Sequence, residues 1–208
     1  MYSKADQIDK NCSILTKYIH PLAAKIIAQW IITLDFKLKI KKERITRFGD
    51  YRPPLGNRNH IITINQNLNP HAFLITLIHE IAHLKVHIEF GPKHLPHGIE
   101  WKRCFSKLLN DFIAIDVFPP DVLFALNTYI KNPAASSCSD LQLYKVLFMY
   151  NTESKMHLLD LLPEGTMFYT KNRRAFIKGK KQRTRYHCKE YNSTKTYLFP
   201  AAYEVYIS

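Results

Sequence analysis

The segment that follows Asn69 and Pro70 constrains the fold of this chain most, because it combines a helical pattern of apolar residues with two histidines. Its apolar residues recur at spacings of three and four, at Phe73, Leu74, Leu77, Ile78, Ile81, Ala82 and Leu84. This period predicts a helix whose apolar side is held in a core. Asn69 is a favoured N-cap residue and Pro70 a favoured first residue, so the helix is expected to begin there.

The histidines on this helix belong to an H-E-x-x-H sequence formed by His79, Glu80 and His83. Four residues advance a helix by about one turn and roughly 6 Å, so both imidazoles project from one face and can bind one cation. Glu80 is offset by about 100°. Its carboxylate therefore lies beside the cation, where it can take a proton from an attacking water. The motif predicts a zinc peptidase; the alternative is two histidines on a solvated helix face.

A catalytic zinc needs a third protein ligand and one open position. The compact form of the motif supplies that ligand ten residues after the first histidine and needs Gly at 86 and His at 89. Val86 and Glu89 stand at those positions, which excludes that class of peptidase.

Four residues remain as sources of the third ligand: His87, His94, His97 and Glu100. His87 lies one turn further along the same helix and would project past the metal, whereas His94 lies in a Gly-Pro loop. His97 follows two helix-breaking residues and opens the next predicted helix, so the chain can return it to the first two histidines. We expect His97 to complete the site, with Glu100 as the main alternative ligand or as a group that orients His97.

The other hydrophobic patterns predict an α+β fold, with helices packed on a small sheet and followed by a small β unit. The domain boundary is expected between residues 150 and 151. Helices are expected over residues 13–34 (with Pro21 kinking or dividing the segment), from near 97 to 112, over 121–130, and over 141–150 after a Ser-rich stretch at 134–139. Strands are expected at 36–40, 60–68, 167–170, 175–178, 183–189, 196–199 and 203–207, with a loop at 49–59.

Composition limits the environment and the partners of the protein. The chain of 208 residues is 46% hydrophobic, which is typical of a globular protein, and its longest apolar stretch, 22–34, is too short to span a bilayer. The four cysteines, Cys12, Cys104, Cys138 and Cys188, lack the paired spacing of a disulfide framework or a zinc ribbon, so we expect a cytoplasmic protein. Cys188 is expected to be a buried small hydrophobe. The net charge of +13 favours a polyanionic partner and a nucleoid association.

The segment 171–185 concentrates this charge, because it contains eight basic residues and no acidic one. We expect its basic side chains to contact nucleic-acid phosphates while aromatic rings stack on unpaired bases; the alternative is a solvated hairpin face. The residues expected to bind nucleic acid are Lys178, Lys180, Lys181, Arg183 and Arg185. The aromatic residues nearby are Phe176, Tyr186 and Tyr191.

Two histidine motifs and the residues before them resemble the SprT-like metalloproteases, whose relatives include the Spartan DNA-protein crosslink proteases. The resemblance covers roughly residues 15 to 113. It rests on His79-Glu80-Ile81-Ala82-His83, His97-Gly98-Ile99-Glu100-Trp101, Arg47-Phe48-Gly49-Asp50-Tyr51 and Ile62-Thr63-Ile64-Asn65. It implies a zincin fold with one zinc bound by His79, His83 and His97, Glu80 as catalytic base, an edge strand along the cleft, activation by DNA and a role in DNA repair.

One departure from that family concerns the C-terminal unit. Many SprT-like proteins carry a four-cysteine zinc ribbon after the protease domain, whereas Cys188 is the single cysteine in this region of the chain. We therefore expect a metal-free descendant of the ribbon, stabilised by an aromatic core of Phe168, Phe176, Tyr186, Tyr197 and Phe199.

The leading hypothesis is a zinc metalloendopeptidase that acts on DNA-associated or DNA-crosslinked proteins. A nucleic-acid-binding protein with a structural zinc and no hydrolysis is the alternative from another class. A peptidase without a nucleic-acid partner is the third reading.

Overall fold

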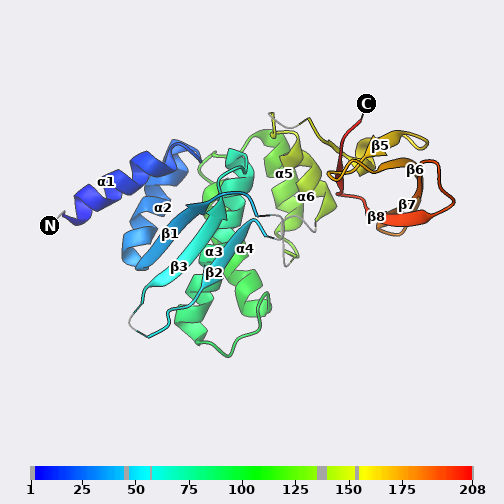
Figure 1. Ribbon diagram of the computed structural model, residues 1–208. Coiled ribbons are helices and arrows are strands. Elements are labelled where there is room, and N and C mark those ends of the chain that lie inside the picture. Colours follow the sequence, from blue (N-terminus) through cyan, green and yellow to red (C-terminus); the bar gives the residue numbers. More distant parts are fainter. Residues whose placement is uncertain (1–2, 45–46, 57, 135–139, 153–154, 208) are drawn as a thin grey trace. The chain divides into compact units, whose positions relative to one another are not determined.

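The computed structural model describes residues 3–44, 47–56, 58–134, 140–152 and 155–207. The fold is α+β, as expected (Figure 1). The chain divides into two compact units, Met1–Leu147 and Phe148–Ser208, where the sequence placed the boundary between 150 and 151. Most of the predicted Ser-rich stretch, residues 135–139, lies outside the described residues.

Two N-terminal helices cover the segment 13–34, for which a helix kinked or divided at Pro21 was expected. Helix α1 spans Lys4–Leu15 and begins at a capping box in which Ser3 and Asp6 exchange side-chain to backbone hydrogen bonds. Helix α2 spans Pro21–Thr33, with Pro21 in its first turn. The chain is therefore divided at Pro21, which is one of the two expected outcomes, because Pro21 lacks an N–H donor and starts a helix instead of continuing one.

A three-stranded sheet forms the centre of the first unit. Strands β1 (Phe36–Lys41) and β3 (His60–Asn65) are parallel, and β2 (Gly49–Arg52) pairs antiparallel with β3, in the order β1-β3-β2. The loop expected over 49–59 is therefore wrong for its first four residues. Turn-forming residues there obscured the strand, because its stability comes from pairing with β3, which lies later in the chain.

The two faces of this sheet differ in chemistry. Leu38, Ile62 and Tyr51 lie side by side in register, as do Ile64 and Gly49, and this face packs against helix α3 (Figure 1). Ile62 and Ile64 are fully buried. The opposite face carries the lysines of β1, which are exposed. The period-two pattern of residues 36–40 therefore predicted both the strand and its basic face.

Helices α3 and α4 carry the histidine motifs. Helix α3 spans Pro70–Phe90, and the side chain of Asn69 accepts a hydrogen bond of 3.0 Å from the backbone N–H of Ala72, which confirms the predicted cap. Helix α4 spans Ile99–Ile113. The apolar side predicted for α4 is confirmed, since all of its members are buried: Trp101, Phe105, Leu108, Leu109 and Phe112.

Helices α5 (Pro120–Tyr129) and α6 (Leu141–Phe148) complete the helical part of the chain, close to the expected ranges. Across the described residues, no helix combines the length and apolar character that crossing a membrane requires.

The second unit is built from short antiparallel strands. Strands β5 (Met167–Tyr169), β6 (Ala175–Gln182), β7 (Arg185–Glu190) and β8 (Thr196–Pro200) form a sheet in that order, while β4 (His157–Leu158) pairs with β9 (Glu204–Val205); a short 3-10 helix, η2 (Leu159–Leu161), follows β4. Its core contains the expected aromatic residues Phe168, Phe176, Tyr186 and Phe199, whereas Tyr197 is half-buried. Cys188 is a free, fully buried thiol, as expected.

Candidate metal centre

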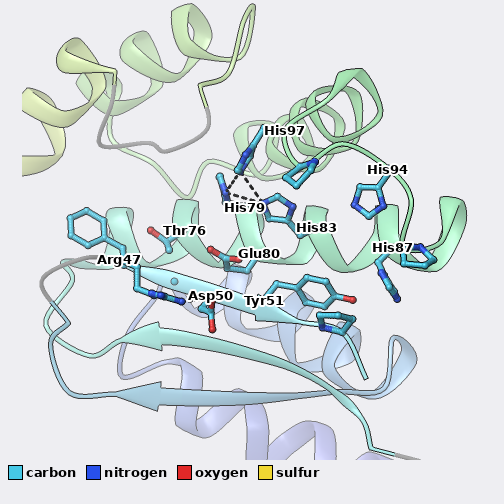
Figure 2. Close-up of a pocket in the computed structure, with 15 residues that line it drawn as sticks. Arg47, Asp50, Tyr51, Thr76, His79, Glu80, His83, His87, His94 and His97 are labelled. Carbon is cyan, nitrogen blue, oxygen red and sulfur yellow. Dashed lines mark hydrogen bonds and ion pairs between the residues drawn. The ribbon is translucent and has the colours of Figure 1, made fainter. Parts of the chain in front are cut away.

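Three histidine side chains converge at one point beside helix α3. The Nε2 atoms of His79 and His83 are 3.2 Å apart, and the Nε2 of His97 lies 3.0 Å from that of His83 and 3.2 Å from that of His79 (Figure 2). Tetrahedral zinc with Zn–N bonds of about 2.0–2.1 Å holds neighbouring nitrogens about 3.4 Å apart. The observed triangle therefore matches the donor spacing of a metal centre, and the three residues form a group able to hold an ion.

The protonation of these imidazoles also suits a cation. Burial lowers the pKa of His79 well below its usual value, and it lowers the pKa of His83 to about 4, in each case helped by the neighbouring histidines. Burial likewise lowers the pKa of His97. The three rings are thus neutral near pH 7, with lone pairs available as ligands. With each ring proton on Nδ1, the three Nε2 lone pairs would face one another and repel, and a cation between them would remove that repulsion.

His97 reaches the site from the connection between α3 and α4. Its backbone has φ +60°, in the left-handed region that residues other than glycine seldom occupy. Pro96 and Gly98 flank it, and Gly98 is the N-cap of α4. Backbone strain of this kind persists where the surrounding fold imposes it, often at functional sites. The fold accepts this conformation at the residue whose ring completes the histidine triangle.

The indole ring of Trp101 packs against all three histidine rings. Its ring centroid lies 4.6 Å from that of His79, 5.3 Å from that of His83 and 4.7 Å from that of His97. The indole N–H is directed at the backbone carbonyl of His79, at 3.4 Å. Sequence reasoning identified Trp101 as a core residue, but it did not show that the indole contacts every histidine of the centre.

Glu80 lies beside the triangle and is 7% exposed. Burial, with a further contribution from Asp50, raises its pKa to about 8, although a hydrogen bond from the backbone of Tyr51 acts in the opposite direction. A group with a pKa near neutrality can both accept and return a proton. Strand β2 thus holds the carboxylate that the sequence assigned as the base.

An open cleft of about 660 Å³ exposes the histidines and Glu80. Its lining runs from Arg47 and Thr76 at one end, past the centre, to Tyr51, His87 and His94 at the other (Figure 2). Strand β2 forms one wall and is an edge strand of its sheet. Arg47 and Arg52 both pair with Asp50, each at 2.7 Å.

The structure distinguishes among the four residues considered as the third ligand. His97 joins the triangle, whereas His87 and His94 line the cleft outside it. Glu100 lies in the first turn of α4, and among the described residues no hydrogen bond joins it to a histidine of the centre. Its expected role in orienting His97 is therefore not seen. Sequence reasoning quoted Gly49 and Tyr51 for the resemblance but gave them no role in the site, because their places in the cleft depend on the pairing of β2. It did not single out Thr76, which lies on α3 one turn before Glu80.

The basic residues expected to bind nucleic acid differ in their surroundings. Lys178 is 4% exposed; its ammonium donates to the carbonyl of Leu162 and lies 4.0 Å from the ring centroid of Tyr186. A buried ammonium cannot reach a phosphate, so the expectation that Lys178 binds nucleic acid is corrected. Lys181 pairs with Asp160 at 2.8 Å.

The remaining members of the set, Lys180, Arg183 and Arg185, are exposed at the hairpin of β6 and β7. Within the described part of the chain they have no acidic partner. Of the three aromatic residues near these basic side chains, Phe176 and Tyr186 are buried, as expected for the aromatic core, and Tyr191 is 48% exposed.

Comparisons of this chain with protein-family models, with curated proteins and with solved structures found no match. The function is therefore argued from the site alone.

Proposed function

We propose that this protein is a zinc-dependent metallopeptidase in which His79, His83 and His97 bind the ion and Glu80 is the general base. The observation that carries the proposal is the convergence of three Nε2 atoms, 3.0–3.2 Å apart, beside a buried carboxylate in an open cleft. Structural zinc is enclosed by four protein ligands, whereas the group found among the described residues has three. A ligand set of three imidazoles suits zinc among the common divalent ions.

When bound, zinc would polarise the carbonyl of the scissile peptide bond and stabilise the negative charge that develops on its oxygen. Glu80 takes the proton of the attacking water and returns it to the leaving amine. Burial favours the neutral form of Glu80 and a bound zinc would favour its carboxylate, and these opposing effects support both transfers. The proposal therefore assigns proton transfer to one side chain and metal binding to three others.

Strand β2 supports the binding of an extended polypeptide. It is the edge strand that lines the cleft, so its outer backbone groups can pair with a substrate strand, as in other cases of strand addition. Gly49 and Tyr51 lie on the side of β2 that faces α3. A peptide paired with this edge would pass the carboxylate of Glu80.

The experiment measures zinc content and cleavage of unfolded casein by the full chain. Glu80→Gln should retain stoichiometric zinc and lose casein cleavage, because it removes the base and leaves the three ligands. Glu89→Gln is the matched control, since Glu89 is an exposed carboxylate on the same helix. Equal cleavage by Glu80→Gln and the wild type would refute the mechanism. Zinc binding with no hydrolysis by the wild type would favour a nucleic-acid-binding protein with a structural zinc.

We further propose that the substrates are proteins bound to or crosslinked with DNA, which accords with the expected cytoplasmic, nucleoid-associated location. The net charge of +13 supports a polyanionic partner. Exposed cations support it in two places: Lys37, Lys39 and Lys41 on β1, and Lys180, Arg183 and Arg185 on the β6–β7 hairpin.

Binding of single-stranded DNA tests this part of the proposal. Replacing Lys180, Arg183 and Arg185 together by Ala should weaken binding and reduce the slope of log K against log salt by about two, since each phosphate contact contributes about 0.7. Lys178→Met is the control, because Lys178 is buried. An unchanged slope in the triple variant would remove this hairpin from the binding surface. Casein cleavage that DNA does not alter would favour a peptidase without a nucleic-acid partner.

A further inference from the structure

The cleft continues along α3 beyond the metal centre into an end that is lined by rings. His87 lies one turn after His83 on α3, Tyr51 lies across from it on β2, and His94 comes from the connection that follows α3 (Figure 2). Three prolines that are close in sequence to Tyr51, His94 and His97 also line the cleft: Pro53, Pro92 and Pro96. We call the surface formed by Tyr51, His87, His94 and these three prolines the ring subsite.

The rings of this subsite are fixed by contacts among themselves. Tyr51 stacks on His60 with ring centroids 5.9 Å apart, and its hydroxyl is 2.9 Å from the Nδ1 of His60. The ring of His87 lies 6.0 Å from that of Tyr51 and 5.8 Å from that of His60. Because the Tyr51 hydroxyl is already bonded to His60, Tyr51 offers the cleft its ring and not a free proton donor. The wall is therefore in place before a ligand arrives.

His94, in the connection between α3 and α4, extends this wall. Its ring centroid lies 6.3 Å from that of His87, and its Nδ1 is hydrogen-bonded to the carbonyl of Gly91 at 2.6 Å. That bond fixes the ring on the loop and leaves Nε2 free of the backbone. Tyr51, His87 and His94 thus line the same part of the cleft.

Charge is distributed unevenly along the cleft. Its charged side chains other than histidine are Arg47, Asp50 and Glu80, and Arg47 is paired with Asp50 at 2.7 Å. Figure 2 shows Arg47 and Asp50 on the other side of the metal centre from His87 and His94. The lining of the ring subsite contains no carboxylate, lysine or arginine. Flat rings favour another ring, because aromatic pairs gain energy from edge and face contacts as well as from burial.

We propose that the ring subsite binds an aromatic side chain of the substrate and so sets the cleavage preference of the enzyme. This inference rests on the proposed function, since it concerns a substrate held at the same metal centre. It assigns a role to His87 and His94, which the metal does not use.

The experiment uses zinc-loaded full chain and a series of octapeptides in which one position is varied in turn around the cleaved bond. At one position on one side of that bond, Phe or Tyr should raise kcat/KM over Ala by about tenfold or more, with Leu and Asp well below Phe. His87→Ala should bring the Phe to Ala ratio close to one. Ile88→Ala is the matched control, because Ile88 is the next residue of α3, is 54% exposed and does not line the cleft.

His94→Ala provides a second variant on the loop, in case His87→Ala disturbs the packing of Tyr51 and His60; it should lower the same ratio. Equal rates for Phe and Ala at every position would overturn the inference, as would Leu equal to Phe. A preference for Asp would assign the subsite to carboxylates instead. A Phe preference that persists in both histidine variants would place the selectivity elsewhere.

Failure of the proposed function gives a different result, namely no cleavage of any peptide. The inference is then tested by the fluorescence anisotropy of the same labelled peptides with zinc-loaded Glu80→Gln. The Phe peptide should bind about tenfold tighter than the Ala peptide. Equal dissociation constants would overturn the subsite as well.

Discussion

Gly49 lies directly against the carboxylate of Glu80. A Cβ atom built on Gly49 would stand 2.7 Å from the Oε1 of Glu80 and 2.8 Å from the Cγ2 of Thr76. Both distances are far below ordinary contact, so the absence of a side chain at Gly49 lets β2 approach α3 at the point where Glu80 lies. The backbone of Tyr51, two residues along the same strand, hydrogen-bonds that carboxylate. The edge strand thus determines where the base can be.

Gly49→Ala should displace the Glu80 carboxylate and lower kcat for peptide cleavage by about a hundredfold, the cost of misplacing a catalytic group by about 1 Å. Zinc content should not change, because the atoms nearest to a Cβ at Gly49 belong to Glu80 and Thr76 and not to the three histidines. Zinc content and casein cleavage, measured on the same preparation, check both statements.

Arg52→Ala, an exposed position on the same strand, is the control and should retain its cleavage. Full activity of Gly49→Ala would mean that β2 can move away from α3, and that the close approach does not position the base.

His97→Asn should abolish zinc binding while the metal-free protein stays folded. Asn adopts the left-handed backbone conformation readily, so the substitution removes the imidazole without adding strain at φ +60°. We expect the affinity for zinc to fall by more than about 100-fold. Removing a residue that only hydrogen-bonds to a ligand typically lowers metal affinity by about 10- to 100-fold, so loss of a ligand should exceed that range. Competition with a chromogenic zinc chelator measures the affinity, and circular dichroism monitors the fold.

Glu100→Gln and His94→Ala are the matched controls for this measurement, and both should bind zinc as the wild type does. A loss of zinc in Glu100→Gln comparable to that in His97→Asn would restore Glu100 as a ligand and contradict the triangle of histidines.

Local sequence determined the parts of the site that lie on single helices. The spacing of His79 and His83 and the apolar side of α4 follow from the helical period of 3.6 residues, which can be read from one continuous segment. The cap at Asn69 follows from the residue type. Among the four candidates for the third ligand, His97 could be favoured from the sequence. The helix breakers between His83 and His97 allow the chain to turn back toward the first two histidines.

The parts that sequence reasoning missed depend on contacts between distant segments. Gly49 and Tyr51 stand in a stretch of turn-forming composition, and only pairing with β3 makes that stretch a strand and brings it to Glu80. Trp101 has the pattern of a core residue, and its contact with all three histidines requires the crossing of α3 and α4. The periodicity of a single segment does not predict contacts between distant segments.

Stability of the zinc-free protein should depend on pH through Glu80. The pKa of Glu80 is about 8 in the fold against 4.5 for an exposed glutamate, so the folded state holds a proton that the unfolded state releases. The stabilisation from this proton is complete below pH 4.5 and is lost as the pH rises through 8. Glu80→Gln lacks this loss. The variant should therefore gain stability relative to the wild type between pH 4.5 and 8, on the order of 4 kcal/mol in total.

Guanidinium unfolding of both proteins in a chelating buffer at pH 5, 6.5 and 8 measures the difference between their free energies of unfolding. The histidines titrate in both proteins, so their contribution cancels in this difference. Added zinc should reduce the difference at pH 8, because a nearby cation favours the carboxylate. A difference that stays constant with pH would mean that the Glu80 carboxyl is not desolvated in the fold.

Lys178 should act as a core residue of the second unit, in contrast to its neighbour Lys180. The alternation along β6 places Lys178 on the same face as Phe176, and its ammonium donates to the carbonyl of Leu162 beside the ring of Tyr186. Lys178→Ala would leave that carbonyl without its donor and open a cavity, at a cost of about 2–3 kcal/mol. Lys180→Ala removes an exposed side chain and should cost less than about 0.5 kcal/mol.

Amide hydrogen exchange of residues 175–190 in the full chain separates the two lysines. Exchange through local opening of this sheet should become about 30- to 150-fold faster in Lys178→Ala, which corresponds to 2–3 kcal/mol at about 1.4 kcal/mol per tenfold. It should be unchanged in Lys180→Ala. Equal protection in the two variants would show that the Lys178 ammonium can leave its buried place without cost, and Lys178 would then rejoin the residues able to reach a phosphate.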